Sequence, residues 1–420
     1  MKAFPTRLKY AYRLHYQTAF DMNRVKPVSV TGMGCLCAAG LNLKSCMDFL
    51  FAGKRHPAPP RGFCSDQEIL YPVFEILDDF FNSDLFNEPH VLRTGQLALT
   101  AALEAVINAG VGRKRLKQQQ VGVCIGTNVA GSVQNKQIQN GSLSENFPYI
   151  LPVDRFKASD PAFHIAREFE LSGPFQTIVN ACSAGGDAIG IGASWIRSGL
   201  CDMVIAGGTD ALYPITYRGF ISLMNCDDGP CKPFDAHRKG LNLGEGAAVM
   251  ILESDTCRKK RGKAPEAFIL GYGSAADAWH FTAPARYGKG LCMAIEEALN
   301  MAGLSASDIA FINAHGTGTL DNDRIESQVF SSLFPNIPFL STKGYVGHTL
   351  GAAGAIEAVF SIECLKQGRI PSSVGFINPD SELSACPIQK ITEIFGKTVL
   401  SDTLAFGGNN SVLVIGIEGD

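Results

Sequence analysis

The sequence contains no apolar run near the roughly 20 residues that a membrane-spanning helix requires. Its first 26 residues carry aromatic and basic side chains where a secretory signal peptide would have a continuous apolar core. Neither sign of charge is in excess, since 37 Lys and Arg stand against 40 Asp and Glu, which argues against a broad nucleic-acid-binding or membrane-binding face. With 420 residues, 46% of them apolar, the chain is expected to be a globular protein with a large hydrophobic core. We expect it to be located in the cytoplasm.

Paired cysteine motifs are also missing. The 13 cysteines include no CxxC pair, and the eight histidines do not fall at zinc-binding spacing. An odd, scattered set of thiols favours a reducing compartment over a disulfide framework, and no metal site is expected. The basic segment of residues 1–26 contains no serine, and we interpret it as a tail or an additional packing arm rather than an organellar transit peptide.

What the sequence does contain is an internal repeat. Two apolar stretches that run into glycines, PVSVTGMG from Pro27 and AFILGYGS from Ala267, predict a strand near the start of each half. Each half continues with a helix of Ala, Leu and Glu that ends at a glycine, Gly110 in the first half and Gly303 in the second. The chain is therefore expected to consist of two related halves.

Further matched segments follow in the same order. Buried-strand patterns start at Val121 and Ile309, and each half then has a short strand, a turn and a helix rich in glycine and alanine. Strands that alternate with helices predict parallel βαβ units and a duplicated α/β protein with its site between the halves. The predicted divisions are an extension at 1–26 and halves at 27–265 and 266–420, with an insertion near Gln134 to Phe163 in the first half.

Cys182 lies in the turn of the first half, in IVNACSAGGD. At a strand-to-helix junction, free backbone N–H groups and the helix dipole favour an anion, so we expect a lowered thiol pKa and a nucleophile. The alternative is an inert buried thiol, which is the default for the other twelve cysteines.

Two histidines accompany this cysteine. His348 occupies the matching turn of the second half, where a helix N-terminus disfavours imidazolium and predicts a neutral ring that donates a hydrogen bond. His315 ends a buried strand in NAHGTGT, a position that a satisfied core histidine also occupies. One cysteine and two histidines on matched turns indicate a shared site.

Four stretches carry these residues: ACSAGG around Cys182, NAHGTGT at 313–319, STKGYVGHTLGAAGAIEA at 341–358 and AFGGNN at 405–410. Together with VTGMG, VIAGGTDA and PFDAHRKGLNLGEGAAVMILE, they resemble the elongating β-ketoacyl-acyl-carrier-protein synthases of the thiolase superfamily. The resemblance runs from about Val28 to the C-terminus in the family's order.

The resemblance implies a thiolase fold, with duplicated βαβ halves in a five-layered α-β-α-β-α core. It implies a decarboxylating Claisen condensation, in which Cys182 accepts an acyl group from a thioester and malonyl on acyl carrier protein supplies the attacking carbanion. No resident cofactor is implied, because phosphopantetheine arrives on the carrier protein. The family is dimeric, which implies a homodimer or a heterodimer with a related ketosynthase subunit.

The resemblance also assigns roles to site residues. The backbone N–H groups of Cys182 and Phe406 are expected to form an oxyanion hole, and His315 and His348 to stabilise an enolate. The remaining expected site residues are the charged pair Lys343 and Glu357, the pantetheine-binding Thr317 and Thr319, the gating Phe406 with Gly407 and Gly408, and the pocket-lining Val129.

Some positions depart from the family's pattern. Ala405 replaces a glycine before the gating phenylalanine, Asn409 replaces a threonine and Leu320 replaces a proline, while Asn180 and Asp187 beside the nucleophile have no counterpart. The resemblance implies fatty-acid, polyene or polyketide-type synthesis, and these differences argue against the housekeeping fatty-acid enzyme, so that a specialised lipid, polyene or polyketide pathway fits as well. Two alternatives remain: a coenzyme A-dependent thiolase, which would need a second cysteine in the turn of His348, and a non-catalytic chain-length partner, which would lack the nucleophile.

Overall fold

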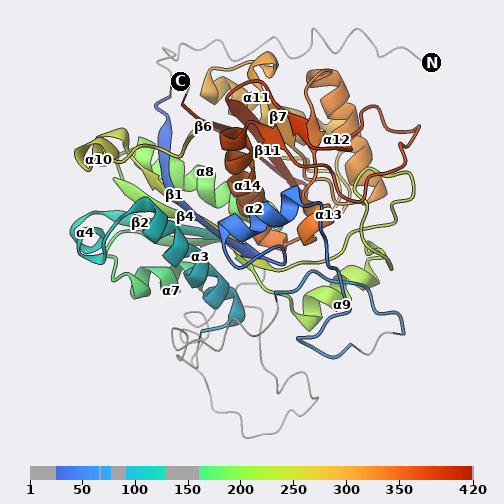
Figure 1. The fold of residues 1–420 in the computed structure, drawn as a ribbon, viewed down its shortest axis with the longest axis horizontal. Coiled ribbons are helices and arrows are strands. Elements are labelled where there is room, and N and C mark those ends of the chain that lie inside the picture. Colours follow the sequence, from blue (N-terminus) through green and yellow to red (C-terminus); the bar gives the residue numbers. More distant parts are fainter. Residues whose placement is uncertain (1–24, 66–67, 77–90, 129–159, 419–420) are drawn as a thin grey trace, which may run out of the picture.

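The computed structural model describes residues 25–65, 68–76, 91–128 and 160–418 (Figure 1). The predicted Val129, and most of the extension at 1–26 and of the insertion near Gln134 to Phe163, lie outside the described residues. All thirteen cysteines lie inside them and are free thiols. None of the helices in the described part is both long and apolar enough to cross a membrane.

The described residues form one ten-stranded sheet and a separate two-stranded sheet. The strands are β1 (Val28–Cys37), β2 (Val121–Gly126), β3 (Phe175–Ile178), β4 (Met203–Asp210), β5 (Gly246–Glu253), β6 (Ala267–Ala276), β7 (Phe311–Asn313), β8 (Phe339–Leu340), β9 (Arg369–Ile370), β10 (Thr392–Glu393), β11 (Thr398–Ala405) and β12 (Asn409–Gly416).

The order of the large sheet repeats itself in the two halves of the chain. It is β3-β2-β4-β5-β1 followed by β6-β12-β11-β7-β8, so that β1 corresponds to β6, β5 to β12, β4 to β11, β2 to β7 and β3 to β8. The halves join where Val28–Val30 of β1 pair with Ala267–Ile269 of β6. The repeat predicted from the sequence is therefore present in the strand order.

The prediction of parallel βαβ units is only partly right, because the sheet is mixed. The three outer strands of each half are parallel, as expected for helix-connected strands. The inner strands pair antiparallel, and β11 turns directly into β12 without a helix. Hydrophobic runs mark buried strands in either direction, so the sequence pattern did not distinguish the two.

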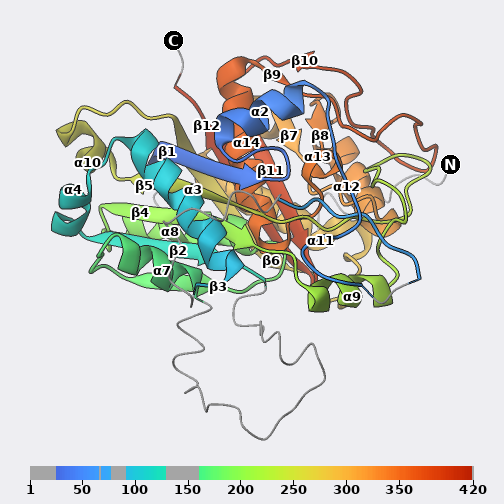
Figure 2. The same cartoon turned by 60° about the horizontal axis from the view of Figure 1, so that its bottom comes forward.

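Helices lie on both faces of each half-sheet and between the halves (Figure 2). The helices are α2 (Leu43–Phe51), α3 (Arg93–Ala109), α4 (Arg113–Gln118), α7 (Pro161–Glu168), α8 (Ala184–Arg197), α9 (Pro214–Ser222), α10 (Asp255–Lys260), α11 (Lys289–Ala302), α12 (Leu320–Leu333), α13 (Lys343–Val346) and α14 (Ala353–Gln367), with 3₁₀ turns η3 (Arg286–Gly288), η4 (Ala306–Asp308) and η5 (Leu350–Ala352).

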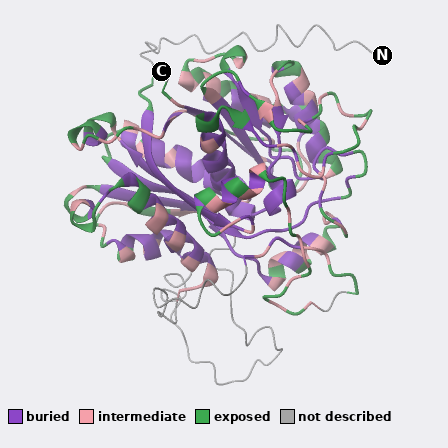
Figure 3. Cartoon of the chain, in the orientation of Figure 1, coloured by how far each residue is buried: buried purple, intermediate pink, exposed green. Residues whose placement is uncertain are grey.

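These elements stack in five layers. Helices α3 and α7 cover the outer face of the first half-sheet and α11 covers that of the second, while α8 and α14 fill the space between. Buried residues gather in the strands and the two central helices, and exposed residues lie on peripheral helices and loops (Figure 3). The predicted α-β-α-β-α thiolase fold is confirmed.

The central helices approach each other closely because their facing residues are glycines. A Cβ atom on Gly185 would lie 2.6 Å from the backbone oxygen of Gly351, and one on Gly354 would lie 2.9 Å from the backbone nitrogen of Gly186. Both distances are too short for any side chain. The glycine-rich sequences of α8 and the segment before α14 thus bring the two predicted turns, with Cys182 and His348, toward one site.

Candidate active site

Cys182 lies in a tight turn between β3 and α8, and its residue is 3% exposed. The preceding Ala181 has a φ of 49°, in the left-handed region that costs an L-residue roughly 1 kcal/mol or more. A strained turn persists only where its surroundings hold it in place.

Those surroundings are supplied by Asp187, the buried acid of α8 for which the sequence offered no explanation. One Asp187 carboxylate oxygen accepts hydrogen bonds from the Asn180 amide (2.6 Å) and the Ser183 hydroxyl (2.8 Å), and the other accepts from Tyr272 Oη (2.9 Å). Tyr272 belongs to β6 of the second half. Asp187 therefore binds a residue on each side of Cys182 and connects this turn to the second half of the molecule.

Replacing Asp187 with alanine is expected to lower the free energy of unfolding by about 2–4 kcal/mol, because the buried Ser183 hydroxyl and the partly buried Asn180 and Tyr272 lose their acceptor. Urea unfolding measures this loss. Asp48→Ala on α2 is the matched control, because Asp48 is an exposed helical acid that pairs with the exposed Lys44. It should change stability by no more than about 0.5 kcal/mol. Equal effects of the two variants would show that Asp187 does not support the turn.

His348 is held in one tautomer by the chain around it. Its Nδ1 accepts a hydrogen bond from the Leu350 backbone N–H (3.2 Å), and its own backbone N–H donates to Asn242 O. Burial, followed by the charge of Lys343, holds the His348 pKa well below its usual value. A neutral ring with Nδ1 occupied carries its proton on Nε2. The predicted neutral donor is present, although burial rather than the helix dipole is the main cause.

His315 is also a neutral ring with its proton on Nε2, but the partner of its Nδ1 is Lys343. The Lys343 ammonium contacts His315 Nδ1 at 3.0 Å, and it also donates to His315 O and to Glu357 Oε1. An ammonium group only donates, so Nδ1 accepts and Nε2 carries the proton. Burial, Lys343 and His348 hold the His315 pKa well below its usual value. The two rings meet edge to face, with centroids 5.1 Å apart.

The predicted pair of Lys343 and Glu357 is buried, with side chains 1% and 3% exposed. Burial raises the pKa of Glu357 to about 7, while Lys343 acts in the opposite direction. The pair fixes a cation beside both histidines and beside Cys182. This arrangement opposes protonation of the imidazoles and favours negative charge on nearby atoms.

The loop that follows His315 is held by acids at the start of α12. Glu326 accepts from the Gly316 N–H (2.7 Å) and Asp323 accepts from the Gly318 N–H (3.2 Å). The hydroxyls of Thr317 and Thr319 are 2.8 Å apart, and both side chains line the cavity that contains Cys182. The two threonines that the resemblance assigns to pantetheine binding therefore line the same cavity as Cys182.

The AFGG turn between β11 and β12 closes the other side of this cavity. The backbone of Phe406 provides a hydrogen bond to Cys182, and the Phe406 ring stacks on Phe220 with centroids 5.4 Å apart. Gly407 and Gly408 follow with φ of 85° and 81°, which favour glycine. Phe406 therefore lies where its N–H can stabilise an oxyanion and its ring can cover the cavity.

The expected low pKa of Cys182 is wrong. Burial raises the Cys182 pKa to about 12, and Lys343 and the Phe406 backbone only partly offset this, while Asp210 and Glu357 raise it further. The sequence placed the residue near a helix start but did not reveal how completely the chain covers it. Cys182 is therefore a thiol at neutral pH.

This protonation state predicts a steep pH dependence of alkylation. Only the thiolate reacts, so the rate at which iodoacetamide modifies Cys182 should rise about tenfold per pH unit from pH 7 to 10 without levelling off. A short peptide with blocked ends and one exposed cysteine, whose thiol has a pKa near 8.5, is the reference and should level off in this range. Peptide mass spectrometry reports the rate at Cys182, and a plateau below pH 8 would contradict the raised pKa.

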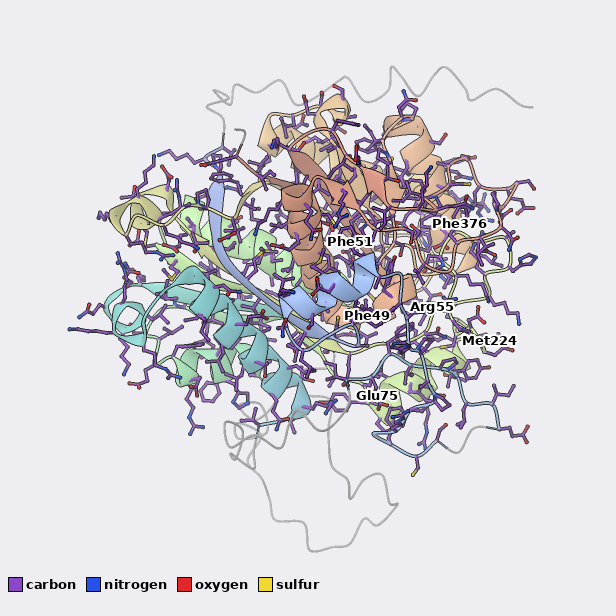
Figure 4. The ribbon with its side chains drawn as sticks, viewed as in Figure 1. Phe49, Phe51, Arg55, Glu75, Met224 and Phe376 are labelled. Atoms are coloured by element: carbon purple, nitrogen blue, oxygen red, sulfur yellow. The ribbon has the colours of Figure 1, made fainter. Side chains whose placement is uncertain are left out.

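The cavity has a volume of about 240 Å³. Its lining contains the predicted Cys182, His315, His348, Thr317, Thr319 and Phe406, while Lys343 and Glu357 lie behind the histidines and Gly407 and Gly408 lie in the adjoining turn. Figure 4 shows Met224, another lining residue and 87% exposed, near the edge of the molecule beside α9. The cavity therefore reaches the surface near Met224.

Sequence reasoning missed three residues of this site. Asp210 at the end of β4 accepts from Thr127 Oγ1 and from the N–H groups of Asn128 and Gly351, joining the halves. Asp277, just after β6, accepts from the Asn410 amide and from the Gly290 and Ala285 backbones. Phe220 is the partner of Phe406. An acid directly at the end of an apolar strand was a signal for both aspartates.

The N-terminal domain family of β-ketoacyl synthases matches residues 25–257, and the C-terminal domain family matches residues 266–376. A mitochondrial protein of Schizosaccharomyces pombe named as a 3-oxoacyl-[acyl-carrier-protein] synthase is 31% identical, with 93% of this chain and 98% of the relative covered. The 3-oxoacyl-[acyl-carrier-protein] synthase 2 of Staphylococcus aureus strain COL is 31% identical, with 94% and 99% covered.

A solved structure described as the ishigamide ketosynthase/chain length factor has a TM-score of 0.85 and 29% identity to this chain. It covers 94% of this chain and 100% of its own.

Proposed function

The chain belongs to the β-ketoacyl synthase family, and on that premise we propose that it condenses an acyl thioester with malonyl-acyl carrier protein to give 3-oxoacyl-acyl carrier protein. The observation that carries the proposal is the state of the two histidines. Both are neutral, both have Nδ1 occupied, and both keep the Nε2 proton for donation. Two such donors beside a cysteine suit a reaction that builds negative charge on a thioester oxygen.

In the first step, Cys182 Sγ attacks the acyl carbonyl carbon, the bond to the carrier's sulfur breaks, and the cysteine proton leaves with that sulfur. Because Nε2 of each histidine carries a proton, neither ring serves as the base. The Phe406 N–H donates to the developing oxyanion. The product is an acyl-enzyme and a free carrier thiol.

In the second step, the bond between the malonyl C2 carbon and its carboxylate breaks, and carbon dioxide leaves. The electron pair becomes an enolate, whose oxygen accepts hydrogen bonds from Nε2 of His315 and His348. The carbanion then attacks the acyl carbon, and the bond to Cys182 Sγ breaks. The departing Cys182 thiolate takes up a proton from solvent, and the charge of Lys343 stabilises the thiolate until then by lowering the pKa of Cys182.

We further propose that the carrier's phosphopantetheine enters past Thr317 and Thr319, that no other cofactor takes part, and that the protein works in the cytoplasm as a homodimer or with a related ketosynthase subunit. The name of the ishigamide protein supports a partner of the chain-length type. A non-catalytic partner role for this chain is disfavoured because Cys182, His315 and His348 share one cavity.

The proposal is tested by incubating the protein with a panel of acyl-carrier proteins of different chain length and saturation, followed by intact-mass and peptide analysis. An acyl adduct confined to Cys182 is expected, and the preferred chain identifies the pathway. Cys182→Ala is the blank. An unmodified Cys182 with every acyl-carrier protein would favour the non-catalytic role, and equal acylation by acyl-coenzyme A alone would favour a thiolase.

A further inference from the structure

Three buried cysteines converge at the end of β1, away from the cavity of Cys182. Cys35 and Cys37 lie on the same face of β1, and Cys46 lies on α2; their residues are 0%, 1% and 0% exposed. Their sulfur atoms all lie within 4.8 Å of one another, and those of Cys37 and Cys46 are 3.7 Å apart. Among the described residues, this is the one cluster of three such ligand atoms.

The spacing of these sulfurs suits a metal ion. A triangle with one side of 3.7 Å and the others at most 4.8 Å has a point no more than about 2.6 Å from every corner, compared with about 2.3 Å for a zinc–sulfur bond. A shift of about 0.3 Å per sulfur would complete the bonds. A disulfide between Cys37 and Cys46 would instead require their sulfurs to approach to about 2.05 Å.

The segments that carry the thiols are fixed before any ion binds. One Glu104 oxygen accepts from the Cys35 N–H (2.9 Å), and the other accepts from the Leu43 N–H (3.0 Å), so that a single carboxylate joins β1 to α2. Cys37 and Gly40 exchange two backbone hydrogen bonds, which form a tight turn, and Gly40 O lies 3.3 Å from Cys46 Sγ. The carbonyl of Gly40 is thus available as a fourth, oxygen ligand.

We propose that Cys35, Cys37 and Cys46 form a structural site for a thiophilic d¹⁰ cation, Zn²⁺ or Cu⁺. Thiolate sulfur is the ligand type that both ions prefer. Binding replaces the thiol protons with the metal and releases them to solvent, so the site closes around the ion and ties the end of β1 to α2. The site lies outside the cavity lining and does not depend on the proposed condensation.

The test begins with elemental analysis of the purified full-length protein, followed by titration with Cd²⁺ as a spectroscopic probe after accessible thiols are blocked with N-ethylmaleimide. About one equivalent of zinc or copper, or one equivalent of Cd²⁺ with a sulfur-to-cadmium absorption band, is expected. Elemental analysis of the purified protein shows whether the native ion is Zn²⁺ or Cu⁺.

Cysteine variants identify the thiols that give rise to the sulfur-to-cadmium absorption band. Cys35→Ala, Cys37→Ala and Cys46→Ala should each abolish it, because each variant removes one of the three sulfur ligands. Cys364→Ala is the matched control, because Cys364 is a buried thiol outside the cluster, and it should leave the band unchanged. The proposal is overturned if the wild-type protein takes up no metal ion, if the band survives Cys37→Ala, or if the protein is 2 Da lighter with a Cys37–Cys46 disulfide. Metal uptake by the wild-type protein tests the proposal even where a variant fails to fold.

Discussion

Cys182→Ala is expected to lower the rate of condensation by at least about 10³-fold, since the loss of a covalent nucleophile removes the acyl-enzyme route altogether. Decarboxylation of malonyl-acyl carrier protein needs the two Nε2 donors but not the thiol, so it should persist within a few fold. Two assays therefore separate the steps: formation of 3-oxoacyl-carrier protein and release of carbon dioxide.

The matched control is Cys124→Ala, which removes a buried thiol of β2 from the same half of the molecule without touching the cavity lining. It should retain condensation within a few fold. If Cys182→Ala kept condensation near the wild-type rate, the nucleophile would have to be another group.

His348→Ala is expected to lower malonyl decarboxylation by about 10²–10³-fold, the usual cost of removing one donor from an oxyanion site. The acyl group should still reach Cys182, because acyl transfer uses the Phe406 N–H rather than His348. Release of carbon dioxide from carboxyl-labelled malonyl-acyl carrier protein measures the first effect, and intact mass of the acyl-enzyme measures the second.

His348→Gln provides the control, because a glutamine amide carries a donor at the reach of Nε2 but has no ring to pack edge to face against Phe220. It should recover part of the decarboxylation that His348→Ala loses. A loss of acylation equal to the loss of decarboxylation in His348→Ala would show that the ring only supports the fold of the cavity.

Much of the fold was predictable because local signals and the repeat agree. The helix ends at Gly110 and Gly303 both adopt the left-handed conformation expected of a glycine cap, each with φ of 65°. The direction of the inner strands was not predictable, because it depends on which strands meet and not on any strand's own pattern.

The candidate site, like the fold, could be predicted from the sequence only in part. Residue types and matched turns brought Cys182, His315 and His348 together, and their pairing with Lys343 and Glu357 followed from the family resemblance. The role of Asp187 could not be found, because its partner Tyr272 lies 85 positions away on the other half. The pKa of Cys182 was misjudged because burial is a property of the folded chain rather than of the turn.

The most direct test of the central claim is a single reaction of the protein with an acyl-carrier protein that it accepts and with carboxyl-labelled malonyl-acyl carrier protein. We expect one labelled carbon dioxide for each 3-oxoacyl-carrier protein formed, and a product two carbons longer than the acyl group. Cys182→Ala should give almost no elongated product, although it still releases labelled carbon dioxide. Neither elongated product nor labelled carbon dioxide, from protein that is folded and supplied with any partner subunit, would contradict it.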